Sequence, residues 1–236
     1  MTDISIIIPV LDEGECINAC IEHVTRQQTN LSIEIIVVDG DPSGSTLNVI
    51  TQPQVIKLQS PKGRAKQMNI GAAQARGSAL LFLHADTQLP ATGLQDVLRT
   101  LEKYPAGAFD VTFGRRFYFQ LVTHIVFWRS HLTRIPYGDQ AIFLRSSYFE
   151  ALGGYADIPI MEDVELMRRI KKRGDHIGFV RNRAETSPRR WQNEGFIFTT
   201  TRNIILSTLF YLGLPAEKLV NYYKSGKRVY RKHEQQ

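Results

Sequence analysis

The 236-residue sequence is poor in cysteine and has no long uninterrupted run of apolar residues. Its two cysteines, Cys16 and Cys20, lie one helical turn apart, which excludes a disulfide framework and is not the spacing of a zinc or redox motif. We expect both thiols to be small apolar residues on one helix face. The first apolar run, Ile4 to Val10, is too short for a signal peptide, which favours a cytoplasmic protein.

Charge is unevenly distributed along the chain. The net charge of +6 divides into −4 before Glu165 and +10 from Glu165 onward. A basic second half is typical of nucleic-acid or membrane-surface proteins, and equally of an enzyme whose arginines bind a phosphorylated substrate. A composition of 43% hydrophobic and 22% charged residues excludes a disordered, fibrous or multi-span membrane protein.

Short β-branched runs alternate with helix-period stretches in the N-terminal part, which is the pattern of βα units and a parallel sheet. The predicted strands are 5–8, 34–38, 55–58, 79–83 and 141–145. The predicted helices are 15–27, a short one after the turn 40–45, 64–76, one around 94–101, one opened by a capping box from Ser147 to Glu150, and 161–173. Glycines are expected to end three of them, at Gly77, Gly153-Gly154 and Gly174. Residues 104–137 show no clear period.

Acidic residues follow three of the predicted strands: Asp12 and Glu13 the first, Asp39 and Asp41 the second, and Asp86 the fourth. The carboxyl ends of parallel strands share one edge, where open α/β sheets bind their ligands. Carboxylates gathered there would repel one another unless a divalent cation or polar ligand atoms lay between them, and hard oxygen ligands favour Mg²⁺ or Mn²⁺. For Asp41 an ordinary turn carboxylate is the preferred interpretation.

Cations gather at the start of the predicted helix 64–76, at Lys62, Arg64 and Lys66. Exposed N–H groups at a helix start favour an anion such as a diphosphate, while a solvated first turn explains the cations equally well. Gly71 costs about 1 kcal/mol relative to alanine inside a helix, which predicts close packing or a close backbone approach. Asn69 is either a ligand contact or an exposed amide.

Glu162 and Asp163 open the predicted helix 161–173, just after a loop that contains Gly153-Gly154-Tyr155. Such a junction presents side chains well, so either carboxylate could serve as a general base. A purely structural interaction with the helix dipole is the alternative.

In this order the motifs resemble those of a family 2 glycosyltransferase with the GT-A fold, over a match that runs to about Trp191. They are Ile6-Ile7-Ile8-Pro9 with Asp12-Glu13, Ile36 to Gly40, Arg64 to Gly71, Leu83 to Asp86, Gly153 to Tyr155 and Met161 to Leu166. The resemblance implies an α/β, Rossmann-like GT-A domain over 1–194, with a mostly parallel sheet flanked by helices. A helical extension with a basic tail would follow over 195–236. Leu83 to Asp86, Tyr137 to Gln140 and Ser187 to Trp191 are similar to a bacterial branch named for radical-SAM and selenodomain association or arsenosugar biosynthesis.

The resemblance also implies residue roles. The implied nucleotide-sugar residues are Pro9, Asp12, Glu13, Asp39, Arg64, Asn69, Gly71, His84, Ala85 and Asp86. Asp39 would bind the base, usually uracil, and Asp86 the Mg²⁺ or Mn²⁺ ion. His84 stands where the family has the first aspartate of its Asp-x-Asp element, which removes a negative charge from the metal site.

The implied reaction is an inverting single displacement that moves a sugar from a nucleotide donor, expected to be a UDP-sugar, to an unknown acceptor hydroxyl. Asp163, with Glu162 beside it, would be the general base. The implied acceptor and diphosphate residues are Asp139, Gln140, Arg189, Arg190 and Trp191. For the first two a structural turn, and for the last three a basic surface turn with a buried tryptophan, is the alternative.

Two other functions compete with this hypothesis. A nucleotidyltransferase would need a Gly-rich phosphate loop after the first strand, where only Gly14 stands. A non-catalytic nucleotide or nucleic-acid binder would not need Asp39, Asp86 and Asp163 together. We therefore expect a nucleotide-sugar partner and no nucleic acid.

The apolar stretch from Phe196 to Leu214 is interrupted by Arg202, so it is not expected to span a membrane. The preferred interpretation is a helix packed on the domain or on a second copy of the chain, because Thr199 to Thr201 make it polar. The alternative is an interfacial helix at the inner face of the membrane, with a basic tail against anionic lipid. The tail residues are Lys224, Lys227, Arg228, Arg231 and Lys232.

Overall fold

The computed structural model describes residues 2–27, 30–114 and 116–231, and the side chains of these except at 190–191, 196–197 and 224–231. Its centre is an eight-stranded sheet with the strand order β3-β2-β1-β4-β7-β6-β8-β5. The strands are β1 (Ile4–Val10), β2 (Ile33–Asp39), β3 (Ile56–Gln59), β4 (Ala79–Phe82), β5 (Thr87–Gln88), β6 (Ala106–Thr112), β7 (Phe143–Arg145) and β8 (Ile177–Thr186).

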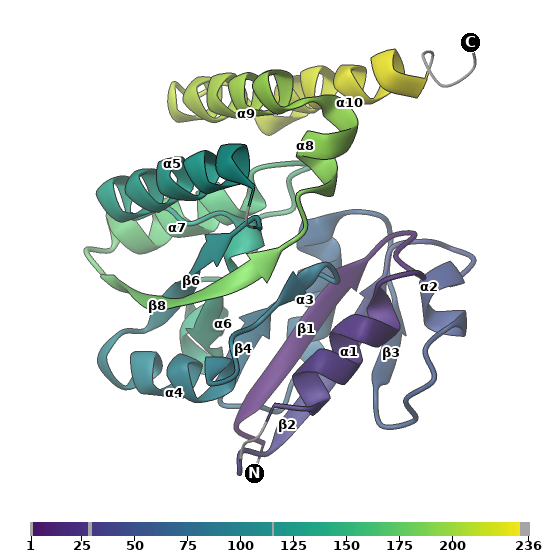
Figure 1. The fold of residues 1–236 in the computed structure, drawn as a ribbon. Helices are drawn as coiled ribbons and strands as arrows, with labels where there is room; N and C mark the ends of the chain where they lie inside the picture. Colours follow the sequence, from purple (N-terminus) through teal and green to yellow (C-terminus); the bar gives the residue numbers. More distant parts are fainter. Residues whose placement is uncertain (1, 28–29, 115, 232–236) are drawn as a thin grey trace.

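Most of the sheet is parallel. Strands β3, β2, β1 and β4 pair in parallel, as do β6 and β8. Only β7, between β4 and β6, and β5, at the edge beside β8, pair antiparallel to their neighbours. The predicted fold class, a mostly parallel sheet flanked by helices, is confirmed (Figure 1).

Helices cover both faces of the sheet, because β1 carries apolar side chains on both of its faces. Ile6 and Ile8 point into one apolar cluster and Ile7 into another. The first cluster is covered by α1 (Ile17–Thr25), α4 (Gly93–Lys103) and α5 (Phe117–Thr133). The second is covered by α3 (Arg64–Gln74), α6 (Ser146–Ala151) and α7 (Glu162–Lys172). The short helices are α2 (Ser45–Asn48), η1 (Gly138–Gln140) and α8 (Arg189–Glu194).

The C-terminal extension consists of α9 (Phe196–Tyr211) and α10 (Ala216–Arg231), which lie across the top of the molecule in Figure 1. Leu206, Phe210 and Leu219 are buried in the second cluster, so the extension packs on the domain, as the preferred interpretation predicts. Among the described residues, no helix is both long and apolar enough to cross a membrane. The side chains of Lys224, Lys227, Arg228 and Arg231, and the whole of Lys232, lie outside the described part.

The sequence pattern missed β6, α5 and β8. Exposed polar residues interrupt the apolar period of β8 at residues 181–183, and α5 carries apolar residues on its outer face as well as its inner one. The predicted capping box is wrong: α6 begins at Ser146, and its N-cap Arg145 makes no side-chain capping hydrogen bond.

Two predictions about glycines have different outcomes. Gly174 and the pair Gly153-Gly154 adopt positive φ just after helices, as expected. Gly77 does not end α3, which stops at Gln74. A Cβ on Gly77 would lie 2.5 Å from the backbone nitrogen of Ser5, so glycine is needed there for the close approach of the chain to β1.

Gly71 is needed where α3 packs on the sheet. A Cβ there would lie 2.6 Å from Ile7 Cγ2 on β1 and 3.1 Å from Val38 Cγ2 on β2. The close packing expected from the sequence is therefore present, and the absence of a side chain lets α3 lie against these two strands. Ile7 and Val38 are branched core residues in a close-packed interior, so neither side chain can move aside easily.

We predict that Gly71→Ala lowers the free energy of unfolding by about 1–2 kcal/mol, because overpacking outweighs the gain in helix propensity. Urea denaturation measures the change. Gly14→Ala is the matched control, since its Cβ would meet only Val49 Cγ2 at an ordinary 3.5 Å. Equal midpoints for the wild type and Gly71→Ala would contradict the packing argument.

Candidate functional site

The topology brings the predicted site residues to one edge of the sheet. Strands β1, β2, β4 and β8 end there, and the turn that precedes the antiparallel β7 lies at the same edge. The loops at this edge carry Glu13, Asp39, Asp86, Gly138 and Arg189. Because side chains far apart in the sequence meet there, hydrogen bonds between loops decide the geometry.

Asp39 stabilises the loop after β2 directly and, through Thr46, the loop after β1. It has no solvent exposure, and its two carboxylate oxygens accept hydrogen bonds from the backbone N–H groups of Asp41 (2.9 Å) and Thr46 (3.1 Å). The Thr46 hydroxyl in turn accepts a hydrogen bond from the backbone N–H of Glu13 at 3.1 Å. Asp39 therefore shapes the loop from inside, and in this conformation its carboxylate does not face solvent.

Asp41 is a turn carboxylate, as expected. Its oxygens accept hydrogen bonds from the backbone N–H (3.1 Å) and hydroxyl (2.6 Å) of Ser43. Hydrogen bonds from the hydroxyl and the backbone N–H of Ser43 lower the pKa of Asp41 to about 2. The preceding loop begins at Asp12, an exposed residue with a left-handed backbone (φ 59°), a conformation that aspartate tolerates better than most residues.

Gln67, which the sequence analysis did not single out, joins the ends of β1 and β2. Its buried amide nitrogen donates hydrogen bonds to the carbonyl oxygens of Val10 (2.6 Å) and Val38 (2.8 Å). A Cβ on Gly40 would lie 3.0 Å from Gln67 Oε1, so glycine leaves room for this amide. Proline is tolerated at position 9 of β1, because the pairing of β1 with β4 stops at Ile7. Beyond that point β1 needs no backbone N–H to donate to β4.

Arg189, the first residue of α8, joins two of the predicted site carboxylates. Its Nη2 lies 2.9 Å from Glu13 Oε2 and 3.2 Å from Asp86 Oδ2. Hydrogen bonds to Glu13, and then to Asp86, raise the pKa of Arg189 above its ordinary value. One guanidinium group thus neutralises carboxylates from the ends of β1 and β4, across 176 and 103 positions of sequence.

The two cysteines differ in their surroundings. Cys20 is buried in the first cluster, and burial raises the pKa of its thiol to about 12, which confirms the apolar role predicted for it. Cys16 lies at the N-cap of α1, only partly buried and close enough to Arg189, Glu13 and Asp86 to interact with their charges. It therefore adjoins the site.

Arg64 and Glu162 form an ion pair between the starts of α3 and α7, with Arg64 Nη1 3.3 Å from Glu162 Oε1. Glu162 is 3% exposed. Burial raises its pKa and Asp163 raises it further, while Arg64 opposes both. The carboxylate of Glu162, predicted to lie beside the general base, is buried against Arg64 and positions this arginine.

Asp163 lies beside His84 and Gly138. Its Oδ2 accepts a hydrogen bond from the backbone N–H of Gly138 at 2.6 Å, and its Oδ1 accepts one from Val164 N at 2.7 Å. A Cβ on Gly138 would lie 3.3 Å from His84 Nε2 and 3.4 Å from Asp163 Oδ2. Glycine at 138 therefore lets the turn approach both the imidazole and the carboxylate, because a side chain there would crowd them. In the sequence only the turn pattern before Asp139 pointed to this glycine.

Three residues predicted to bind the nucleotide sugar, Asn69, Gly71 and Ala85, make contacts within the protein itself. The Asn69 amide donates to the Tyr155 carbonyl oxygen (2.8 Å) and accepts from the Tyr155 N–H (2.9 Å), and Gly154 leaves it room. Gly71 packs on the sheet, as described above. The side chain of Ala85 is buried in the first cluster, so only its backbone could meet a ligand, which corrects the prediction for this residue.

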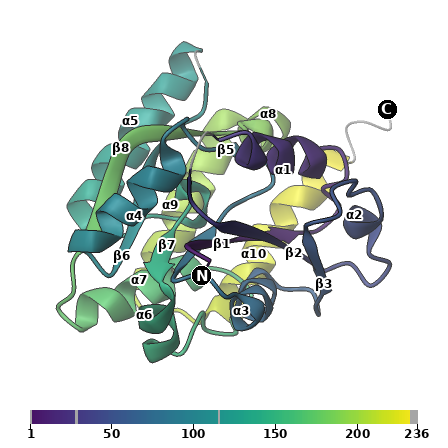
Figure 2. The same cartoon turned by 90° about the horizontal axis from the view of Figure 1, so that it is seen from below.

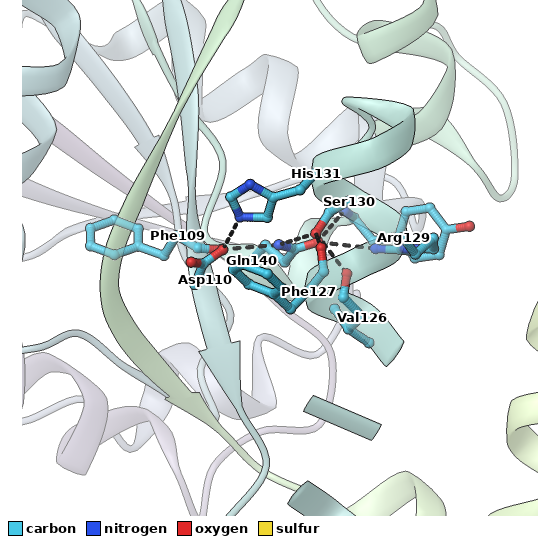
Figure 3. A network of polar contacts seen from close by, with 9 residues as sticks. Phe109, Asp110, Val126, Phe127, Arg129, Ser130, His131 and Gln140 are labelled. Carbon is cyan, nitrogen blue, oxygen red and sulfur yellow. Dashed lines mark hydrogen bonds and ion pairs between the residues drawn. The ribbon is translucent and has the colours of Figure 1, made fainter. Parts of the chain in front are cut away.

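Gln140 is fully buried, which corrects its predicted place on the acceptor side. Its Oε1 accepts hydrogen bonds from Arg129 Nη2 (3.0 Å) and Tyr137 N (3.2 Å), and its Nε2 donates to the carbonyl oxygen of Phe109 (3.1 Å), as Figure 3 shows in part. Gln140 thus ties the turn to α5 and β6. Asp139 is half-buried in the same turn, and the side chains of Arg190 and Trp191 lie outside the described ones.

The site has a limited set of metal ligands. The described residues contain no group of three or more histidine, cysteine or acidic side chains that could hold a metal ion. Glu13 and Asp86, however, both lie within 3.2 Å of one arginine nitrogen. One or two carboxylates are what Mg²⁺ takes from a protein when substrate phosphates complete its shell, so this pair fits such an ion bound together with a diphosphate.

Comparison with known proteins identifies the family of the chain. The model of "Glycosyl transferase family 2" matches residues 5–155, more than half of the chain. The chain belongs to glycosyltransferase family 2. The matched part contains the loops of Glu13, Asp39, Arg64, Asp86 and Gly138.

Curated glycosyltransferases resemble only part of this family 2 chain. The PGL/p-HBAD biosynthesis glycosyltransferase of Mycobacterium tuberculosis is 33% identical over 92 residues, 36% of each chain. Glycosyltransferase GlyG of Streptococcus pneumoniae is 25% identical over 118 residues, 47% of this chain and 38% of GlyG. The alignments span little more than a third of these relatives.

Solved structures confirm the GT-A fold of this family 2 chain. The mannosyltransferase PcManGT from Pyrobaculum calidifontis, in complex with GDP-Man and Mn²⁺, superposes with a TM-score of 0.67 at 15% identity, covering 90% of this chain and 65% of PcManGT. TarS residues 1–349 from S. aureus superposes with a TM-score of 0.58 at 15% identity, covering 92% of this chain and 68% of that one.

We predict that Arg64→Met destabilises the protein increasingly as the pH rises. Because the folded-state pKa of Glu162 lies above its ordinary 4.5, the folded state binds more protons than the unfolded state, and stability falls as the pH rises past that value. Removing Arg64 raises this pKa further. The loss should be small near pH 4 and about 2 kcal/mol near pH 8, measured by urea denaturation.

The double variant Arg64→Met/Glu162→Gln is the control, because it removes the charge that lost its partner. It should recover most of the lost stability at pH 8 and show a weaker pH dependence. A loss in Arg64→Met that is equal at both pH values would contradict the pairing with Glu162.

Proposed function

We propose that this chain is an inverting glycosyltransferase that moves a sugar from a nucleoside-diphosphate sugar to an acceptor hydroxyl, with Asp163 as the general base. The observation that carries the proposal is the meeting of Asp163, His84 and Gly138 at the sheet edge that also holds Arg189 with Asp86. Family membership favours this function over nucleotidyl transfer and over non-catalytic nucleotide or nucleic-acid binding.

The proposed reaction is a single displacement. An acceptor hydroxyl oxygen attacks the anomeric carbon of the donor sugar, and the bond from that carbon to the diphosphate oxygen breaks. Asp163 takes the hydroxyl proton: each of its oxygens accepts one backbone N–H and keeps a second lone pair. Gly138 keeps a side chain away from this carboxylate, since a Cβ there would crowd both Asp163 and His84.

Arginines receive the leaving group. The nucleoside diphosphate departs with the electrons of the broken bond, and the guanidinium groups of Arg189 and Arg64 offset its charge. Both side chains are accessible to it, with exposed fractions of 43% for Arg189 and 42% for Arg64. Asp86 and Glu13 would hold a Mg²⁺ or Mn²⁺ ion, which supplies further neutralisation of the diphosphate when bound. His84 keeps the metal side less negative than a second aspartate would.

Several finer features belong to the same proposal. The donor is a UDP-sugar by resemblance to the family, and GDP-mannose is the alternative because it is bound in PcManGT. The similarity to the radical-SAM and selenodomain-associated branch rests on Leu83 to Asp86, Tyr137 to Gln140 and Ser187 to Trp191. We place the enzyme in the cytoplasm, where free thiols such as those of Cys16 and Cys20 are the rule.

We predict that Asp163→Asn lowers donor hydrolysis, with water as the acceptor, by roughly 10²- to 10⁴-fold. The measurement is release of UDP or GDP from a panel of nucleotide sugars with Mn²⁺ or Mg²⁺, alongside calorimetric binding of UDP and GDP. Binding should survive the substitution. Asp157→Asn, an exposed acid paired with Lys66 at 3.6 Å, is the control and should keep the wild-type rate. Unchanged hydrolysis in Asp163→Asn would refute the assignment of the base.

We predict that Arg189→Gln separates metal binding from catalysis. Without nucleotide, the variant should bind Mn²⁺ at least about tenfold more tightly, because a cation no longer occupies the space between Glu13 and Asp86. Donor hydrolysis should fall, because the diphosphate loses its arginine. Mn²⁺ binding is measured by electron paramagnetic resonance, with Arg181→Gln, an exposed arginine of β8, as the control. Weaker Mn²⁺ binding in Arg189→Gln would contradict the shared site.

A further inference from the structure

Helix α5 exposes a stripe of large apolar side chains. Its members recur at helical spacing along the outer face, and we call them the α5 stripe: Phe117 (84% exposed), Leu121 (50%), Ile125 (43%), Trp128 (60%) and Leu132 (76%). The spacing of three or four residues places them in one row along the helix. A row of this length on a helix surface is far more than the scattered apolar residues that every protein exposes.

The inner face of α5 combines apolar side chains, Phe119 and Val122 in the first cluster, with buried polar ones. Ser130 and Thr123 are buried, and His131 Nε2 donates a hydrogen bond to Asp110 Oδ1 of β6 at 2.8 Å. Arg129 bonds Gln140, as drawn in Figure 3. These contacts fix which face of α5 turns inward. A surface helix in water normally buries its most apolar stripe, whereas α5 is held so that this stripe faces outward.

Charged residues of the segment that contains the stripe have one sign. The sequence from Val111 to Gly138 contains no aspartate or glutamate, and exposed arginines, Arg116 and Arg134, stand at the two ends of α5. A helix with an apolar face, an aromatic content that includes tryptophan, and basic ends fits the interface of an anionic bilayer. The arginines would lie among lipid phosphates, with the apolar side chains below them.

A second copy of the chain fits the stripe less well. Two-fold pairing places the two α5 helices either antiparallel, with Arg116 beside the partner's Arg134, or parallel, with each arginine beside its own equivalent. In both arrangements like charges meet, and the helix offers no acid to separate them. Charge complementarity therefore favours lipid over self-association.

We propose that the α5 stripe is a docking surface for an anionic lipid bilayer, on which the protein lies with α5 in the membrane interface. This surface is separate from the basic tail of the C-terminal extension. It is also independent of the proposed reaction, because docking requires neither donor nor acceptor. The far side of the molecule, where α2 lies, is turned away from α5 (Figure 2).

Vesicle co-sedimentation of the full chain tests the proposal. The wild type should bind vesicles of phosphatidylcholine with roughly 30% phosphatidylglycerol, and bind pure phosphatidylcholine several-fold more weakly. Leu121→Ser/Trp128→Ser/Leu132→Ser should reduce partitioning by more than about tenfold. Arg116→Gln/Arg134→Gln should reduce binding to the anionic vesicles only. Val49→Ser, which removes an exposed apolar side chain next to α2, is the control and should bind like the wild type.

Thermal unfolding shows whether each variant is folded, and light scattering gives its oligomeric state. If the triple variant is folded and binds anionic vesicles like the wild type, the α5 stripe is not the docking surface. If the wild type binds neither vesicle and is a dimer that the triple variant turns into a monomer, the stripe is a self-association face. Loss of binding after neutralising Lys224, Lys227 and Arg228, with the triple variant unaffected, would assign docking to the tail and overturn the proposal.

Discussion

The arrangement of the site depends on one electrostatic constraint. Several carboxylates meet at the carboxyl edge of the sheet, and each of them needs a hydrogen-bond donor or a cation beside it. Buried or crowded carboxylates without partners cost several kcal/mol or lose their charge. Backbone N–H groups hold Asp39 and Asp163, and arginines hold Glu13, Asp86 and Glu162. These donors come from different loops, so meeting the charge requirement also fixes how the loops lie relative to one another.

Both arginines join parts of the fold that are distant in sequence. Arg64 connects α3 to the start of α7, and Arg189 connects α8 to the ends of β1 and β4. The same guanidinium groups are the cations that a diphosphate would meet. In the proposed enzyme, donor binding would therefore replace carboxylate partners of the arginines by phosphate oxygens, which links substrate binding to the positions of α7 and α8.

Helix α5 has a hydrogen-bonded inner face and an exposed apolar outer face. Gln140 and Asp110 bind its inner face, so hydrogen bonds, together with the burial of Phe119 and Val122, fix the orientation of α5 while a second apolar row stays exposed. The turn that Gln140 stabilises also carries Gly138, which holds Asp163. The helix that would lie on a membrane and the proposed base are thus attached to the same few residues.

The parallel half of the fold could be predicted from residue order alone, because β1, β2 and β4 are short apolar runs followed by acids. The positions of Glu13, Asp39, Asp86 and Asp163 after or between predicted elements could be predicted in the same way. The sequence could not predict β8 or α5, whose patterns are broken by exposed polar or exposed apolar residues. Only the tertiary structure decided the partners: that Glu162 pairs with Arg64, that Gln140 is buried, and that Gln67 joins two strand ends. The physical reason is that residue type sets what a side chain can donate or accept, whereas the packing of distant segments sets what lies within hydrogen-bond distance of it.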